Sequence, residues 1–272
     1  MRLPKWFVGE FIGTFMLVFF GCGSVAAAVL TGAQIGIFQV AIVWGIGIAL
    51  AIHLTASLSG AHLNPAVTIA MAAFGGLPRQ RVPGYILTQL LAAFTAAAVL
   101  HGIFGSALVD FEKANAITRG ASGSEASAMV YGEYFPNPGG KALDQVSRES
   151  LGLARAFLVE ATGTAVLLLV ICGLTDPRNK ARVEHLTPLG IGLTVTLLIS
   201  LLAPLTQAGF NPARDFGPRL FSALAGWKDI PFTTNGHGWW LVYIVAPVIG
   251  GLAGAALHRF VLAPAYGRSD SD

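Results

Sequence analysis

The stretch Gly209-Phe210-Asn211-Pro212-Ala213-Arg214-Asp215 indicates the start of a helix within a very apolar chain. Asn is a preferred N-cap residue, and proline suits the first helical position because its missing N–H would be unpaired there. A shorter copy, His62-Leu63-Asn64-Pro65-Ala66-Val67, lies in the first half of the sequence. The apolar run after each copy is too short to cross the bilayer core, which takes about 20 helical residues. The sequence therefore predicts two half-helices, over residues 65–74 and 212–224.

The composition is typical of a polytopic membrane protein. Of the 272 residues, 54% are hydrophobic and 11% are charged, whereas soluble domains carry about 25% charged residues. The net charge of +3 comes from scattered basic residues. Membrane proteins carry an excess of Lys and Arg in the loops on the cytoplasmic side, and this tendency explains the basic residues. They do not indicate nucleic-acid binding. Apolar stretches long enough to span a bilayer occur at about 6–30, 36–57, 84–107, 152–174, 187–204 and 239–262.

The two halves of the chain repeat one another. The first-half residues that recur at an offset of 150 are Glu10, Gly13, Thr14, Leu17, Cys22 and Gly23, and the Asn-Pro-Ala motifs are offset by 147. We therefore divide the chain into a first repeat (1–107), a connecting loop (108–150), a second repeat (151–262) and a tail (263–272). Each repeat holds three spans, and an odd number inserts the second repeat upside down relative to the first.

The predicted fold is an all-α membrane protein with six transmembrane helices and two re-entrant half-helices in an inverted repeat. The half-helices enter from opposite faces and meet near the midplane. Lys and Arg flank the spans on the side of the termini. This bias predicts a multi-pass protein of the cell (plasma or inner) membrane with both termini cytoplasmic. The 108–150 loop is then extracellular or periplasmic. Gly250 and Gly254 form a Gly-xxx-Gly pair that predicts a close helix crossing.

Irregular backbone leads into each half-helix. Non-helical backbone at membrane depth is tolerated only where protein buries it or water wets it. A narrow path that contains water would provide hydrogen-bond donors for the exposed carbonyls. The carbonyls would form one wall of this path, and apolar side chains of the membrane spans would form the other. Such a path suits water or a small neutral polyol. The expected carbonyl ladder comprises Gly60, Ala61, His62, Leu63, Gln207, Gly209 and Phe210.

Fixed positive charge is expected where the half-helices meet. Each helix N-terminus carries roughly +0.5 of an elementary charge, which repels cations and protons. The amides of Asn64 and Asn211 would donate hydrogen bonds to a passing oxygen and interrupt a proton wire. Arg214, one turn inside the second half-helix, would add a full charge. We expect it to serve this function rather than to pair structurally with an acid.

Two buried acids occupy equivalent positions in the repeats. Glu10 and Glu160 are expected to accept backbone N–H groups from the irregular segments, and a proton relay is the alternative. His53, His62 and His101 read as structural histidines, with His62 lining the path through its carbonyl. Cys22 and Cys172 read as buried free thiols. The pattern predicts no catalytic residue, no metal site and no cofactor, so an enzyme is not expected.

At these motifs the sequence resembles the aquaporin family, and within it the glycerol facilitators. The resemblance rests on Ser59-Gly-Ala-His-Leu-Asn-Pro-Ala-Val-Thr68 and Asn211-Pro-Ala-Arg-Asp-Phe-Gly-Pro-Arg219. Asp215, Arg219 and the loop segments Asp110-Phe111-Glu112 and Tyr134-Phe135-Pro136-Asn137-Pro138 resemble the glycerol branch. The resemblance implies a homotetramer in the lipid bilayer with one pore per subunit. It further implies passive conduction of glycerol, with urea and water as further solutes.

The resemblance also implies a selectivity ring of Trp44, Ile199, Ala208 and Arg214. Trp44 and Arg214 fit a glycerol facilitator, whereas such channels often have an aromatic residue at the position of Ala208. The combination is closer to the nodulin-26-like channels of plants. Tyr243-Ile244 also departs from the glycerol branch, which tends to have proline followed by an aliphatic residue. A ring with Ala208 should be wider than one with Phe.

Other functions remain open at this point. Within the same class, the chain could be a water, ammonia or metalloid-hydroxide channel. From a different class, inverted repeats with broken helices also describe secondary active transporters. Those usually carry an ionisable site for a coupling ion near the midplane, where this sequence offers two Asn and one Arg.

Overall fold

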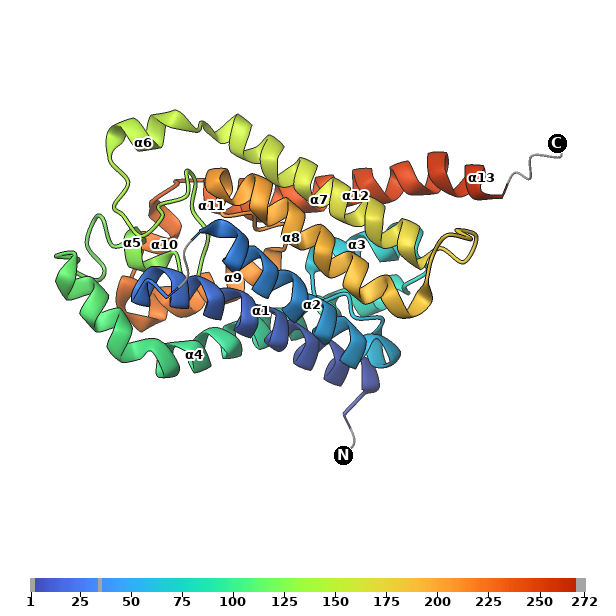
Figure 1. Ribbon diagram of the computed structural model, residues 1–272, viewed down its shortest axis with the longest axis horizontal. Coiled ribbons are helices and arrows are strands. Elements are labelled where there is room, and N and C mark those ends of the chain that lie inside the picture. Colours follow the sequence, from blue (N-terminus) through green and yellow to red (C-terminus); the bar gives the residue numbers. More distant parts are fainter. Residues whose placement is uncertain (1–2, 34–35, 268–272) are drawn as a thin grey trace.

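Six long helices lie side by side in the computed structural model, which describes residues 3–33 and 36–267 (Figure 1). Within those residues, six helices are long and apolar enough to cross a membrane. Five of them contain α1 (Lys5–Thr31), α2 (Ile37–Ser59), α4 (Val82–Ala114), α7 (Leu153–Thr175) and α8 (Thr187–Thr206). The sixth, Gly238–Tyr266, is built from α11 (Gly238–Trp240), η4 (Leu241–Val245), α12 (Ala246–Leu257), η5 (His258–Leu262) and α13 (Ala263–Tyr266). The predicted fold class is confirmed.

Two short helices complete the bundle. They are α3 (Pro65–Phe74) and α9 (Pro212–Ser222). The second ends slightly before the predicted residue 224, because the chain changes there to a π-helical turn, η3 (Ala223–Trp227). Gly226 within this turn has φ of +113°, a backbone conformation that glycine adopts without the penalty other residues pay.

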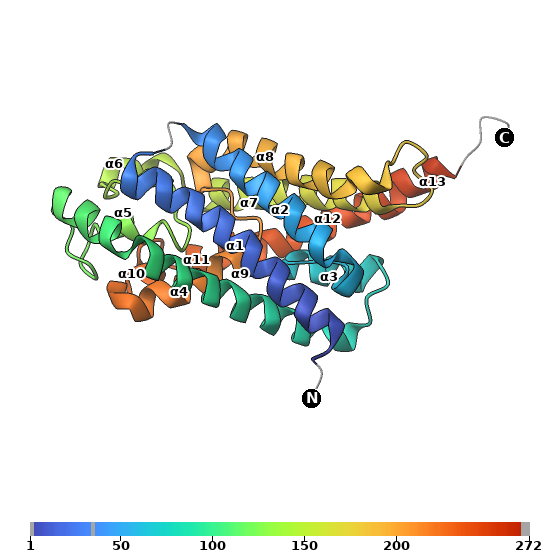
Figure 2. The same ribbon diagram turned by 60° about the horizontal axis from the view of Figure 1, so that its bottom comes forward.

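The packing is that of an inverted repeat. In the first repeat α1 packs against α2 and α4, and in the second α7 packs against α8 and α12. Helices α2 and α8 join the two repeats. Each half-helix packs on the last long helix of the other repeat, α3 on α12 and α9 on α4, and Figure 2 shows α3 and α9 entering from opposite ends. This exchange brings the two half-helix N-termini together inside the bundle.

The crossing of α7 and α12 depends on two glycines. A Cβ atom on Gly250 would lie 2.0 Å from the carbonyl oxygen of Ala161, and one on Gly254 would lie 2.0 Å from that of Ala165. Real Cβ atoms do not approach so closely, so the backbones are in contact only because both residues lack a side chain. The predicted close crossing is confirmed.

The connecting segment folds over the bundle end opposite the C-terminus (Figure 1). Helix α4 continues to Ala114, two turns past the predicted end at residue 107, so the segment begins as helix. It then forms α5 (Glu125–Ala128) and α6 (Gln145–Ser150). Arg148 joins α6 to Glu125, at 3.1 Å, and to the carbonyl of Thr234 just after α10 (Ile230–Thr233), at 2.9 Å. The segment is therefore an ordered cap on that end of the bundle.

Candidate functional site

The two Asn-Pro-Ala motifs meet inside the bundle and hold each other. Asn64 caps α3 by accepting the N–H of Ala66 at 2.8 Å, and Asn211 caps α9 by accepting the N–H of Ala213 at 3.0 Å. The amide nitrogen of each donates across the interface, Asn64 to the carbonyl of Phe210 and Asn211 to the carbonyl of Leu63, both at 2.8 Å. One N–H of each amide is thus committed to the opposite repeat, and one is left for a solute.

Two buried carboxylates hold the irregular segments. Glu10 accepts the N–H groups of His62 and Leu63 at 2.9 and 2.8 Å. Glu160 accepts those of Gly209 and Phe210 at 3.0 and 2.7 Å. Both side chains are fully buried. Each carboxylate therefore turns a pair of backbone N–H groups away from the interior of the path.

The segments are built from left-handed backbone. Positive φ occurs at Gly60, Ala61 and Leu63 in the first and at Gln207, Ala208 and Phe210 in the second. Five of these residues are not glycine, and such conformations cost free energy that the surrounding contacts must offset. Within the part of the chain that the structure describes, no N–H or O–H group donates to the carbonyls of Gly60, Ala61, His62, Gln207, Ala208 and Gly209. These carbonyls are free to accept from a solute.

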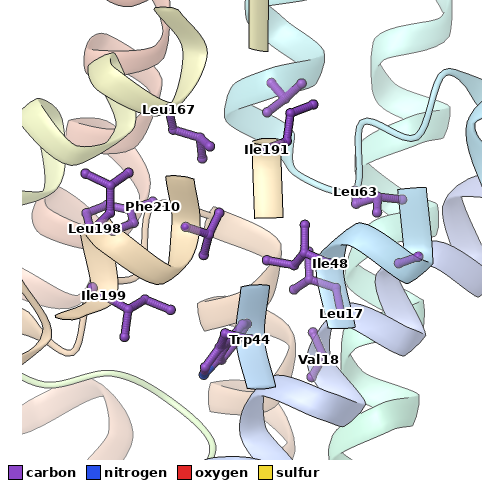
Figure 3. Close-up of a cluster of buried hydrophobic side chains, with 14 of the residues drawn as sticks. Leu17, Val18, Trp44, Ile48, Leu63, Leu167, Ile191, Leu198, Ile199 and Phe210 are labelled. Carbon is purple, nitrogen blue, oxygen red and sulfur yellow. The ribbon is translucent and has the colours of Figure 1, made fainter. Parts of the chain in front are cut away.

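A cavity of about 460 Å³ runs past both segments. One wall holds the ladder residues Gly60, Ala61, His62, Leu63, Gly209 and Phe210, whereas Gln207 lines a second cavity on the side of the connecting segment. Apolar side chains from the long helices complete the lining, and Figure 3 shows them around the interior together with the side chains of Leu63 and Phe210. Those on the cavity include Leu17, Ile48, Leu167, Ile191 and Ile199. The path has one hydrogen-bonding side and one apolar side.

The four predicted ring residues lie together where the two cavities meet. Trp44, Ile199 and Arg214 line both cavities, and Ala208 lines the first. The guanidinium carbon of Arg214 lies 4.8 Å from the centroid of the Trp44 ring. The second cavity, of about 530 Å³, opens above this junction. We call this junction, between the second cavity and the path between the half-helices, the constriction.

One expectation about Arg214 is wrong. The sequence suggested an unpaired charge, but Nε of Arg214 lies 2.8 Å from Oε1 of Glu133, and both side chains are buried. Nη1 of Arg214 also donates to the carbonyl of Tyr131 at 2.8 Å. A buried unpaired guanidinium is costly, and the connecting segment supplies the counter-charge. Arg214 still lines both cavities, so it is at once paired and exposed to the path.

Glu133 is the residue that sequence reasoning missed. It lies in a polar loop, and no spacing relates it to Arg214. A second buried ion pair fixes its backbone, because Asp215 accepts the N–H of Glu133 at 2.8 Å and binds Arg219 at 2.8 Å. Arg219 also donates to the carbonyls of Glu133 and Pro231. The sequence signal was an acid directly before the loop segment Tyr134-Phe135-Pro136-Asn137-Pro138, which resembles the glycerol branch.

Of the histidines and cysteines considered in the sequence, only His62 lines the main cavity. His62 lines the cavity and its Nδ1 lies 3.3 Å from the hydroxyl of Thr68. His101 contacts the hydroxyl of Tyr131 at 2.8 Å, and His53 is exposed on α2. Cys22 is buried and Cys172 partly so, both as free thiols. Among residues 3–33 and 36–267 no group of three His, Cys, Asp or Glu side chains is arranged to hold a metal ion.

Comparison with known proteins places this geometry in a family. The sequence pattern of the family described as major intrinsic protein matches residues 1–258. The glycerol uptake facilitator protein of Pseudomonas aeruginosa is 43% identical over 257 residues, covering 94% of this chain and 88% of that protein. The glycerol uptake facilitator protein of Escherichia coli K12 is 40% identical over 253 residues, covering 93% and 86%.

The fold is also shared with a solved structure. The aquaglyceroporin from Plasmodium falciparum aligns with a TM-score of 0.81 and 27% sequence identity, over 96% of this chain and 98% of that one.

A propanediol uptake facilitator of Citrobacter freundii is a further sequence relative. It is 38% identical over 256 residues, covering 94% of this chain and 91% of that protein.

Proposed function

Because the chain belongs to the major intrinsic protein family, we propose that it is a passive transmembrane channel for glycerol. The observation that carries this proposal is the two-sided path. Free carbonyls and one spare N–H on each of Asn64 and Asn211 line one side, and aliphatic side chains line the other. Glycerol has hydroxyl groups along one edge and C–H groups along the other, so it exchanges hydration for matched contacts on both sides.

The constriction orients the solute. Nη1 of Arg214 donates to the carbonyl of Tyr131 and Nε lies 2.8 Å from the Glu133 carboxylate. Arg214 lines the path, so its remaining guanidinium N–H groups are donors for a solute. A hydroxyl oxygen accepts from them while its carbon lies against Trp44 or Ile199. Below the ring the same hydroxyl donates to the ladder carbonyls. Since each step replaces one hydrogen bond by another, no deep binding well forms and conduction needs no energy input.

Ions are excluded mainly by desolvation. A charged solute entering an apolar-walled path loses water that the ladder does not fully replace, and the cost for an unpaired charge is large. The two half-helix N-termini oppose cations further. The Asn64 and Asn211 amides fix the direction of hydrogen bonds at the midplane, so a continuous proton wire is interrupted.

Further solutes follow from the size of Ala208. Its methyl group leaves the ring wider than an aromatic residue would, so we propose that urea and water also pass. We also propose that the chain assembles as a homotetramer in the bilayer. Both termini are proposed to be cytoplasmic, following the distribution of Lys and Arg in the sequence.

The test is stopped-flow light scattering on proteoliposomes. Vesicles mixed with sucrose should shrink faster than protein-free vesicles, because water leaves through the channel. Vesicles mixed with glycerol or urea should re-swell faster than protein-free vesicles, because the solute enters. Their internal pH should stay unchanged when an external acid step is applied. Fast water flux without glycerol flux would contradict the glycerol assignment, and a proton leak would contradict the exclusion mechanism.

A further inference from the structure

The path changes character at the end where the termini lie. There the cavity lining passes from aliphatic residues to Thr175, Arg182, Glu184 and Thr187. These residues belong to the end of α7, the loop after it, η2 (Glu184–Leu186) and the start of α8. Figure 1 shows the α7–α8 loop at the same end of the bundle as the C-terminus. Charged and hydroxyl groups thus surround this mouth of the proposed channel.

Arg182 is an uncommitted cation at this mouth. Its side chain is 25% exposed, and in the described residues its one ion-pair partner is Glu184, at 3.7 Å. That distance is beyond a hydrogen bond, and the Glu184 side chain is 77% exposed, so solvent screens the pair. The other cavity-lining guanidinium, Arg214, hydrogen-bonds a carbonyl and pairs with a buried carboxylate at 2.8 Å. Among residues 3–33 and 36–267, Arg182 has no such partner and its guanidinium donates no hydrogen bond, so its five N–H groups are available to a ligand.

The loop holds Arg182 in place. Asp176 accepts from the backbone and guanidinium of Arg178 at 2.8 to 3.0 Å, and its other neighbour is Nε2 of His258 at 3.2 Å. Asn179 donates to the carbonyl of Gly173 at 2.9 Å. The hydrogen bonds from Arg178 lower the pKa of Asp176 to about 2, so this anchor stays ionised at physiological pH. The N–H of Arg182 donates to the carbonyl of Asn179 at 3.1 Å.

The hydroxyl groups beside Arg182 are acceptors. Thr175 donates to the carbonyl of Ile171 at 2.7 Å and Thr187 to that of Leu174 at 3.1 Å. Both residues line the cavity, and each hydroxyl oxygen keeps lone pairs that can accept a hydrogen bond; the Glu184 carboxylate adds further acceptors. The mouth combines one cation that can bind an oxyanion with several acceptors that can bind hydroxyl groups. A guanidinium binds phosphate oxygens through two parallel hydrogen bonds.

We propose that this mouth is an inhibitory site for the phosphomonoester of a small polyol, with Arg182 binding the phosphate. The inference rests on the proposed glycerol path, since the polyol part lies where a conducted glycerol would lie. The phosphate cannot follow, because its charge cannot be desolvated in the apolar-walled path. The ligand therefore stops at the mouth and closes it. A phosphotransfer reaction acting on the conducted polyol would supply this ligand.

The test measures glycerol flux in proteoliposomes with glycerol phosphate both inside the vesicles and in the external solution. The reference vesicles have sucrose at equal osmolarity in its place. Wild-type flux should fall as glycerol phosphate increases. Arg182→Gln should raise the half-inhibiting concentration about tenfold or more, the loss expected for one charge-assisted two-point contact. Lys180→Gln is the matched control, because it removes one positive charge from the same loop at an exposed position. Equal inhibition of wild type and Arg182→Gln would overturn the proposal.

A binding readout separates this proposal from the channel function. Glycerol phosphate should raise the Tm of the detergent-purified wild-type protein and not that of Arg182→Gln, whereas Arg182→Lys should retain part of the shift. An equal shift with inorganic phosphate would overturn the polyol part, and a shift only with phosphatidylglycerol micelles would assign the site to a lipid headgroup instead. Absent glycerol flux without ligand contradicts the proposed function, while normal flux that ignores glycerol phosphate contradicts only this inference.

Discussion

At the scale of single residues, the pairing of Arg214 with Glu133 sets the electrostatics of the constriction. The two side chains lie 2.8 Å apart and are buried, so the ring carries a hydrogen-bond donor without a full net charge. This is compatible with a channel for neutral solutes. It also means that exclusion of cations does not rest on Arg214 alone, because the half-helix N-termini and desolvation act independently.

The pair predicts a strong thermodynamic coupling. Removing one partner of a buried ion pair costs about 3–5 kcal/mol because the other charge is left uncompensated. We therefore expect Glu133→Gln and Arg214→Val each to lower the Tm of the purified protein, and the double variant to lose less than the sum. A thermal unfolding series on the four proteins measures this coupling. Strictly additive losses would show that the two side chains do not compensate each other.

Ring width predicts a change in solute ranking. Ala208→Phe adds an aromatic ring at the constriction, so flux of branched or larger solutes, such as erythritol, should fall before flux of glycerol. Ala208→Ser, which adds one oxygen atom, is the matched control and should leave the ranking unchanged. Stopped-flow re-swelling in each solute gives the ranking. Equal loss of all solutes in Ala208→Phe would indicate misfolding instead of sieving.

At the scale of elements, the half-helices are where sequence reasoning reached furthest. Asn followed by Pro predicted the caps of α3 and α9, and the helices begin at Pro65 and Pro212. The repeat predicted their opposed entry. It could not predict that the Asn64 and Asn211 amides bond across to the opposite loop, because that contact depends on how two distant segments dock.

Glu10 and Glu160 hold the two irregular segments in the same way, so replacing either carboxylate should have the same effect on glycerol flux and stability. Glu10→Gln and Glu160→Gln each replace an acceptor pair by one acceptor and one amide that opposes the backbone N–H donors. Because each loop would relax, we expect glycerol flux per protein and Tm to fall in both variants. Flux and Tm on matched protein amounts provide the measurement. Intact glycerol flux with altered proton conductance in one variant would favour the proton-relay alternative.

The connecting segment marks the limit of prediction from sequence. Its polar composition predicted a loop, yet helix α4 extends to Ala114, and Tyr131, Glu133 and Tyr134 are buried. Hydropathy reports transfer from water to lipid, whereas these residues are buried by the protein itself, and the charge of Glu133 is compensated by Arg214. Glu133 could be assigned to Arg214 only once the fold had brought residues 81 positions apart into contact.

At the scale of the whole molecule, the outer faces of the bundle remain apolar. Leu189, Leu193, Leu197, Leu201 and Leu205 follow one another at four-residue spacing along α8, and each is at least 40% exposed. Lipid or neighbouring subunits can cover such faces. The proposed homotetramer predicts that native mass spectrometry in a mild detergent finds a complex of four 28.4 kDa chains. A monomer that conducts glycerol at the full rate would contradict the assembly and leave the pore account intact.

The whole molecule is proposed to conduct glycerol passively along the two-sided path. The most direct measurement is the rate of glycerol entry into proteoliposomes as a function of temperature and of glycerol gradient, with and without proton and sodium gradients. We expect an activation energy close to that of diffusion in water, a rate that rises linearly with the gradient, and no effect of either ion. Saturation with a high activation energy, or uptake driven by an ion gradient, would contradict it and identify a transporter.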